Sequence, residues 1–365
     1  MLPLREFWRR NKRKILITAG VLGSGYAIYK LYSAHRRKFA ELERQHVAER
    51  ASEELVKAQM QAHFDNVQAI SETLTLPHAV NSISRRIAEE LDHSKIIDSL
   101  MKAKGQLSNS ESLRLWEELK VLSFTRLVVS LWTVIIITLY VRVQMNILSR
   151  HLYLDIAQGL GSSDSLEDQD LVGWDDQEKF LSSADYLSNR GLLGLISSFQ
   201  AVVLDVLKVK QLKDSFTTPS LAETITQILD IFMGAGRPLH WVGYLMPESN
   251  LASQPPSEDG NTTLHALMEE ARAVLSSEEF GVVVQACFKV LVDALACDIM
   301  EQFSSDVAAA ASGGVALAKL LPRVAQMGSP LLHEVSSNRY VHMIRRVPQV
   351  EPFFTLLYAN VASPP

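Results

Sequence analysis

Apolar residues recur along most of this chain at the spacing of an α-helix. The clearest case follows Ser276-Ser-Glu-Glu279, where capping serines precede apolar positions at i, i+3, i+4 and i+7. Those positions are Phe280, Val283, Val284, Cys287, Phe288, Leu291 and Leu295. We find no convincing strand pattern and no internal repeat. The pattern therefore predicts an all-α fold, with Cys287 in its core.

The most apolar part of the body lies between residues 111 and 150, which contain neither Pro nor Gly. Its central run, Leu127 to Val141, is apolar apart from Ser130, Thr133 and Thr138. A helix of that length spans about 22 Å, whereas a transmembrane helix usually needs about 20 residues. We therefore predict one long helix whose second half is buried on all sides. A second membrane span is the alternative.

The remaining pattern predicts further helices separated by polar or Gly-rich segments. The predicted helices cover 38–65, 80–104, 178–186 and 191–213, one from the capping box Ser220-Leu-Ala-Glu223 to Met233, and a last pair at 314–327 and 350–361 joined by a turn at Gly328-Ser-Pro330. The helices are predicted to break at 105–110 and 234–238. Two longer loops are predicted, a mobile acidic loop at about 159–178 and a second loop at about 250–263. No linker separates two self-sufficient patterns, so residues 33–365 are predicted to form a single elongated helical bundle around the long apolar helix.

The chain begins with a basic tail, residues 1–14, followed by an apolar segment, residues 15–32. Eighteen helical residues reach about 27 Å, enough to cross a thin bilayer. We interpret 15–32 as an uncleaved membrane anchor; a cleaved signal peptide and a mitochondrial-type presequence are the alternatives. The apolar residues of the anchor are Ile15, Leu16, Ile17, Val21, Leu22, Tyr26, Ile28 and Tyr29.

Charge is distributed very unevenly. The first 38 residues carry ten Lys and Arg side chains against one carboxylate, whereas the rest of the chain has a formal charge of −14. An acidic body excludes a nucleic-acid-binding role, and the basic start suits lipid headgroups. Counting Lys and Arg on the two flanks of the anchor, six before it and four after it, predicts an N-terminus in the cytosol.

The sequence shows no catalytic or metal-binding motif. It has only two cysteines, and its ten histidines are scattered rather than spaced as metal ligands. Asn261-Thr262-Thr263 is a formal glycosylation sequon that we interpret as an ordinary polar loop. We predict a non-enzymatic protein without metal or cofactor. A membrane-anchored enzyme with dispersed catalytic residues is an alternative.

One aromatic residue stands out at the start of the long helix. Trp116, in Leu115-Trp-Glu-Glu-Leu119, begins an amphipathic turn just before the buried run. It is either a core residue or an exposed anchor for a partner helix. An anchored, acidic body without catalytic motifs favours a surface that binds an amphipathic helix in a groove.

Several segments resemble the peroxin-3 family of peroxisome biogenesis proteins, particularly its plant members. The strongest similarity lies between residues 111 and 155, in Leu115-Trp-Glu-Glu-Leu-Lys-Val-Leu-Ser-Phe-Thr-Arg126, Val141-Arg-Val-Gln-Met-Asn-Ile-Leu148 and Tyr153-Leu-Asp155. Phe7-Trp-Arg-Arg10, Gly20-Val-Leu-Gly-Ser-Gly-Tyr26 and Phe180-Leu-Ser-Ser183 also resemble the family.

The resemblance implies a docking receptor in the peroxisomal membrane. Its cytosolic helical bundle would capture the N-terminal amphipathic helix of peroxin-19, a soluble carrier of newly made peroxisomal membrane proteins, and so direct their insertion. The family also implies a lumenal N-terminus, opposite to the charge count. It further implies that the protein reaches the peroxisomal membrane directly or through the endoplasmic reticulum and contacts the lipids of these membranes. A tether or import receptor on another organelle is the alternative.

The resemblance also implies the residues of the docking groove. The groove residues would be Trp116 at the centre, with Leu115, Leu119, Asn146 and Lys319 around it. The chain departs from some family members at Ser112, where they have Lys four residues before the Trp. That departure puts an ion pair with the partner helix in doubt.

Overall fold

The structure is a computed structural model that describes residues 71–102, 108–161, 174–234, 240–247, 262–303 and 314–359, together with single positions between 62 and 69. The chain divides into two units, Met1–His63 and Phe64–Pro365, and the fold below belongs to the second. The predicted basic tail, the membrane anchor at 15–32 and most of the helix predicted over 38–65 lie outside the described residues.

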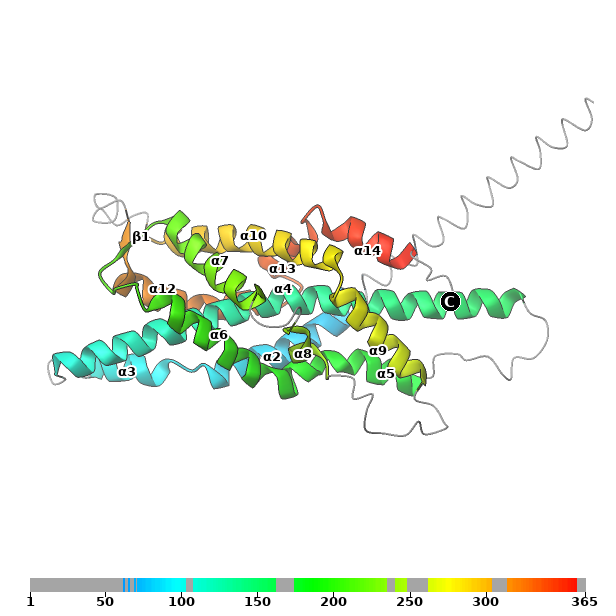
Figure 1. The fold of residues 1–365 in the computed structure, drawn as a ribbon, viewed down its shortest axis with the longest axis horizontal. Helices are drawn as coiled ribbons and strands as arrows, with labels where there is room; N and C mark the ends of the chain where they lie inside the picture. Colours follow the sequence, from blue (N-terminus) through cyan, green and yellow to red (C-terminus); the bar gives the residue numbers. More distant parts are fainter. Residues whose placement is uncertain are drawn as a thin grey trace, which may run out of the picture. The chain divides into compact units, whose positions relative to one another are not determined.

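The second unit consists almost entirely of helices (Figure 1), which confirms the predicted all-α fold. The elements in chain order are η1 (Ser71–Thr75), α2 (Leu76–Glu90), α3 (Ser94–Lys102), α4 (Asn109–Gly161), α5 (Trp174–Ser182), η2 (Ser183–Asp185), η3 (Leu187–Gly191), α6 (Leu192–Leu207), β1 (Ser215–Phe216), α7 (Thr218–Gly234), α8 (Val242–Leu245), α9 (Thr262–Leu275), α10 (Glu278–Glu301), β2 (Val315–Ala316), α12 (Leu317–Leu331), α13 (Arg339–Arg345) and α14 (Val350–Ala359). The strands β1 and β2 pair antiparallel, with Ser215 opposite Ala316.

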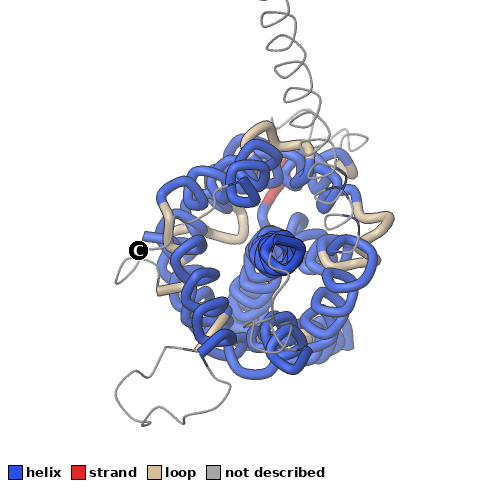
Figure 2. The backbone as a smooth tube through the Cα atoms, turned by 90° about the vertical axis from the view of Figure 1, so that its right-hand side faces the viewer, coloured by secondary structure: helices blue, strands red, loops and turns tan. Residues whose placement is uncertain are grey.

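Helix α4 is the centre of the bundle. Viewed end-on in Figure 2, it is surrounded by the other helices, and every residue from Ser123 to Arg150 is buried. This confirms the predicted long apolar central helix. By length and composition alone, three stretches of helix could cross a membrane, namely Asn109–His151, Asp175–Leu207 and Glu278–Glu301. In the first of these, 83% of the most apolar window is already buried inside the protein.

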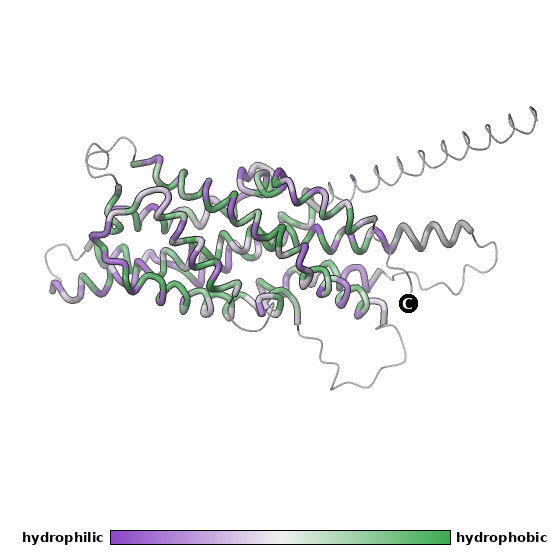
Figure 3. The backbone as a smooth tube through the Cα atoms, turned by 45° about the horizontal axis from the view of Figure 1, so that its top comes forward, coloured by the Kyte–Doolittle hydropathy of each residue, from purple (hydrophilic) through white to green (hydrophobic). Residues whose placement is uncertain are grey.

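The outer helices are amphipathic and turn their apolar faces toward α4. Figure 3 shows apolar and polar positions alternating at short intervals along these helices. Helix α10 follows this rule as predicted: the Ser277 side chain accepts a hydrogen bond from the Phe280 amide at 3.1 Å, and Cys287 is fully buried. The indole of Trp132 on α4 makes edge contacts with Phe199, Phe232 and Trp241 at centroid distances of 6.3, 6.0 and 6.2 Å. Burial of these aromatic side chains stabilises the bundle.

The predicted helix over 80–104 is wrong, because it is two helices. Helix α2 ends at Glu90, and α3 begins at Ser94. Between them, Asp92 Oδ1 accepts hydrogen bonds from the Ser94 amide at 2.9 Å and the Ser94 hydroxyl at 2.6 Å. These bonds cap the new helix, so the chain can turn without leaving amide groups unpaired.

The turn predicted at Gly328-Ser-Pro330 is also wrong. Helix α12 continues through these residues to Leu331. Gly328 lies against α4, where an added Cβ would sit 3.0 Å from Arg126 Cγ and 3.2 Å from Ser130 Oγ. The glycine therefore lets two helices approach closely instead of ending one of them. The chain turns later, at Asn338, and the following helix α13 was not predicted.

Four helix boundaries also differ from the predictions. Helix α7 begins one turn before the predicted capping box, because Thr217 Oγ1 accepts from the Ser220 amide at 3.3 Å and Ser220 Oγ accepts from the Thr217 amide at 3.2 Å. Helix α6 ends at Leu207 rather than near 213. The predicted acidic loop is shorter than expected, since α4 extends to Gly161 and α5 begins at Trp174. Residues 162–173 and 251–261 lie outside the described residues.

Candidate functional site

Trp116 lies in the third turn of α4, ahead of the buried part of the helix. Trp116 and Leu115 are half-buried, whereas Leu119, one turn later, is only 2% exposed. The indole is thus neither a fully enclosed core residue nor a free surface residue. It keeps part of its ring available while its neighbour Leu119 anchors the segment in the core.

Helix α3 runs back along this part of α4. The two helices are joined by six residues and pack against each other, and His93, just before α3, contacts Arg126 of α4. The apolar residues of α3, namely Ile96, Ile97 and Leu100, are half-buried like Leu115 and Trp116. We call these five residues the α3–α4 surface. Its side chains are apolar and partly exposed at the N-terminal end of the central helix.

A buried guanidinium holds the base of this hairpin. Arg126 donates from Nη2 to Ser329 Oγ at 3.0 Å, and its Nη1 lies 3.0 Å from His93 Nδ1. Burial and the nearby Arg126 charge lower the pKa of His93. A neutral imidazole accepts the hydrogen bond from Arg126, so α3, α4 and α12 are fixed to one another at this point.

Lys120 fixes the same end of α4 to α6. Its side chain is buried, and its ammonium group donates to the backbone oxygens of Leu207 at 3.2 Å and Lys210 at 2.8 Å, and pairs with Glu117 at 2.6 Å. A buried ammonium with three oxygen partners is satisfied and rigid. The turn that carries Trp116 is therefore held in place from both sides.

Lys319 lies at this same end of the bundle. It is exposed in the first turn of α12, next to Ala318, whose amide donates to the Leu212 backbone oxygen at 2.9 Å. Leu212 is two residues from Lys210, which accepts from Lys120. Backbone contacts through Leu212 and Lys210 therefore connect the start of α12 to Lys120, one turn after Trp116.

The structure does not bring Asn146 to the predicted groove. Asn146 lies thirty residues beyond Trp116 on one continuous helix, which corresponds to about 45 Å. Its side chain is 1% exposed and donates from Nδ2 to the Arg142 backbone oxygen at 2.6 Å. Its similarity to a family motif therefore marks a core position of α4, and the expected site lacks this residue.

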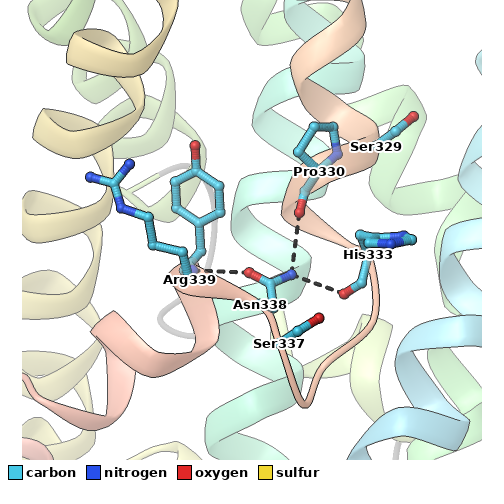
Figure 4. A pocket seen from close by; sticks show the side chains of 7 residues that line it. Ser329, Pro330, His333, Ser337, Asn338 and Arg339 are labelled. Atoms are coloured by element: carbon cyan, nitrogen blue, oxygen red, sulfur yellow. Dashed lines mark hydrogen bonds between the residues drawn. The ribbon is translucent and has the colours of Figure 1, made fainter.

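Several hollows lined by described residues were not predicted from the sequence, and none of these is lined by Trp116 or Leu115. One lies between α12 and α13, with a volume of about 490 Å³. Figure 4 shows that its polar groups bind one another: Asn338 donates to the backbone oxygens of Pro330 at 3.2 Å and His333 at 2.9 Å. These bonds make a structural turn. Another hollow is a larger apolar groove between α9, α10 and α14. The helical spacing of its lining residues is the sequence signal that could have predicted it.

Within the described residues, no group of three or more His, Cys, Asp or Glu side chains is arranged to hold a metal ion. Some ion pairs in this part of the chain join helices to each other, as Arg339 does with both oxygens of Asp298 at 2.7 and 2.9 Å.

Comparison with known proteins agrees with the sequence motifs. The family model described as Peroxin-3 matches residues 102–360. Peroxisome biogenesis protein 3-1 of Arabidopsis thaliana is 49% identical over 359 residues, which cover 98% of this chain and 99% of that protein. Peroxisomal biogenesis factor 3 of Homo sapiens is 26% identical over 390 residues, covering 99% of this chain and 98% of that protein. The family model matches most of the chain, and the Arabidopsis protein is 49% identical over nearly its full length. These matches show that the chain belongs to the peroxin-3 family.

Proposed function

We propose that this protein is a docking receptor on the peroxisomal membrane, and that its α3–α4 surface binds the N-terminal amphipathic helix of peroxin-19. The observation that carries the proposal is the half-buried Trp116 in a partly exposed apolar surface that is backed by buried Leu119. Such a surface is suited to the apolar face of a helix.

Family membership supports the coarser part of this proposal. The relatives are named as peroxisome biogenesis proteins or factors, which are not names of enzymes. A role in peroxisome biogenesis follows for this chain. The apolar helices fit a peroxisomal membrane protein. We further propose that residues 15–32 anchor it with the N-terminus in the lumen and the body in the cytosol.

In the proposed mechanism, the docking surface binds the partner helix tightly and the membrane anchor fixes the receptor at the peroxisomal membrane. A large aromatic side chain that becomes fully desolvated on binding contributes a disproportionate share of the binding free energy. Lys120 and Arg126 hold the segment rigid, so little conformational entropy is lost when the partner binds. The membrane anchor then determines where the carrier delivers its cargo, the newly made membrane proteins.

Exposed Lys319 supplies a positive charge at this end of the bundle. A partner helix with a carboxylate at its edge would gain from that charge. Ser112, half-buried one turn before Trp116, supplies none. We therefore expect Lys319, rather than position 112, to set the electrostatic part of recognition.

The test is the affinity of the full-length protein, in nonionic detergent, for a fluorescent peptide with the sequence of the N-terminal peroxin-19 helix. Trp116→Ala should weaken binding by roughly 2 kcal/mol, or about 30-fold. Leu193→Ala, at a 53% exposed apolar residue of α6, is the matched control and should bind normally. Unchanged affinity together with a lower melting temperature would mean that Trp116 only supports the core.

A further inference from the structure

A second apolar groove lies between α9, α10 and α14, and it is built from helix faces. On and just beyond α9, the lining residues are Glu270, Ala273, Val274 and Ser277; at α14 they are Gln349, Pro352, Phe353 and Leu356. Both sets follow the i, i+3, i+4, i+7 spacing of one helix face. In the described structure, these two faces therefore border a groove rather than pack against another helix.

The surface of the groove is apolar and reaches solvent. Its volume is about 1050 Å³, and two of its apolar residues are largely exposed, Leu356 at 68% and Val282 at 56%. Phe353 forms part of its base through a ring contact with buried Phe280 at 5.8 Å. Single exposed apolar residues are ordinary, but several along one groove indicate an interaction site.

Two buried arginines of α4 attach the walls of the groove to the central helix. Arg150 pairs with Glu270 on the α9 wall and donates from Nη1 to the Leu357 backbone oxygen on the α14 wall at 3.3 Å. Arg142 bonds Glu351 of α14 at 3.1 Å and lies 4.3 Å above the Phe354 ring. Because both walls are attached to the rigid central helix, the groove exists before any partner binds. A preformed groove lowers the entropic cost of binding.

The edge of the groove is acidic. Glu279 lines it and Glu278 precedes it, both exposed in the first turn of α10. In the described part of the chain, neither carboxylate takes part in an ion pair or side-chain hydrogen bond, in contrast to Glu270 and Glu351. The free charge at the mouth of the groove is thus negative. It favours a cationic partner and disfavours anionic lipid headgroups.

The length of the groove fits a helix. From Gln349 to Leu356 its α14 wall extends over eight residues, a rise of about 10 Å. Apolar anchors at i, i+3 or i+4, and i+7 of a bound helix span the same distance. We propose that this groove is a second docking site, for an amphipathic helix of a partner protein that carries Lys or Arg on the edge facing Glu279.

This inference does not rest on the proposed role of the α3–α4 surface. The groove is attached to α4 near residues 142–150, and Trp116 lies about 40 Å or more away along the same helix. Two helices could bind at once. A partner held at both ends would gain avidity without any new contact.

The test uses the full-length chain in nonionic detergent and two synthetic fluorescent peptides of about five helical turns. Both carry leucines at i, i+3, i+4 and i+7; one has Lys and the other Glu at the remaining edge positions. The Lys peptide should bind more tightly than the Glu peptide. Leu356→Glu should weaken its binding at least tenfold. Glu279→Lys should weaken binding of the Lys peptide and strengthen that of the Glu peptide.

Matched variants control for non-specific attraction to an acidic protein. Glu223→Lys, at an exposed acid of α7, and Leu193→Ala, at an exposed apolar residue of α6, should both leave binding of the Lys peptide unchanged. Because Leu356 and Glu279 are exposed, their variants should have the melting temperature of the parent. If Leu356→Glu melts at a lower temperature, the loss of Lys-peptide binding is tested with Glu279→Gln instead. The proposal is overturned if neither peptide binds, if Glu223→Lys acts like Glu279→Lys, or if the groove takes up a fluorescent fatty acid and neither peptide displaces it.

Discussion

The Glu270 carboxylate links two helices of the bundle, α9 and α4. It does so through Arg150 and through His151, whose Nε2 lies 2.8 Å from the carboxylate. Burial acts to raise the pKa of Glu270, but hydrogen bonds from His151 and Arg150 outweigh burial, and its pKa is lowered. An acid with a lowered pKa stabilises the fold above its ordinary pKa of 4.5, and that stabilisation is lost as the pH falls through the folded value.

We predict that Glu270→Gln lowers the free energy of unfolding at neutral pH by roughly 1–3 kcal/mol, because Arg150 stays buried without its charged partner. The variant should also lose less stability than the parent as the pH falls below about 5, through the ordinary pKa of 4.5 and then the lowered pKa of the folded state. Urea unfolding at several pH values measures both effects. If the stability of variant and parent depends on pH in the same way, the pKa of Glu270 does not differ between the folded and unfolded states.

The two thiols should differ sharply in reactivity. Burial raises the pKa of Cys287 to about 12, whereas Cys297 is exposed on the same helix. Because the thiolate is the reactive form, we predict one maleimide label on the folded protein and two after denaturation. Intact-mass spectrometry counts the labels, and Cys297→Ser should remove the single label of the folded state. Two labels on the folded protein would place Cys287 outside the core.

Single residues were predictable from the sequence only where helix periodicity determines them. Cys287 and Phe280 follow the apolar spacing of one helix, and both are buried as predicted. Asn146 was assigned to the groove by motif similarity alone, and its burial depends on what surrounds α4. Trp116 is half-buried, and helix α3 packs against α4, an arrangement that local sequence does not encode.

At the scale of elements, close contacts between helices decide where glycine is required. A Cβ on Gly191 would collide with the Tyr244 backbone, lying 2.8 Å from its carbonyl carbon, whereas a Cβ on Gly281 in α10 would meet nothing within 4 Å. The two positions therefore form a matched pair. One glycine allows close packing, and the other only weakens its helix.

We predict that Gly191→Ala destabilises the protein by about 1–3 kcal/mol, since the backbone of one element must move. Gly281→Ala should instead stabilise it by about 0.5–1 kcal/mol through lower entropy of the unfolded chain. Thermal or urea unfolding of both variants compares them directly. A stabilising Gly191→Ala would contradict the contact with Tyr244.

The helices that the sequence predicted well are those with a strong periodic pattern and a local cap. Helix α10 has both, and its cap at Ser277 was predicted correctly. The break at Asp92 was missed because apolar spacing continues across it, and α12 was cut short because Gly328 and Pro330 usually end a helix. The break depends on the side-chain cap that Asp92 gives Ser94, whereas α12 continues because Gly328 packs against Arg126, a contact distant in sequence.

At the scale of the whole molecule, one buried helix organises two separate apolar surfaces. The N-terminal turns of α4 carry the α3–α4 surface, and its buried arginines near residues 142–150 carry the groove of α9 and α14. Because α4 is continuous, both surfaces keep a fixed spacing. The first of these surfaces is the proposed docking site for the peroxin-19 helix.

The most direct test of that proposal is site-specific photo-cross-linking of the full-length protein to the N-terminal peroxin-19 helix. A photoreactive amino acid is placed at Ser112, beside Trp116, or at Val282, in the second groove. We predict a cross-linked product from position 112 that disappears when Trp116 is changed to Ala, and none from position 282. A product from position 282 alone, or one from 112 that survives Trp116→Ala, would contradict docking at the α3–α4 surface.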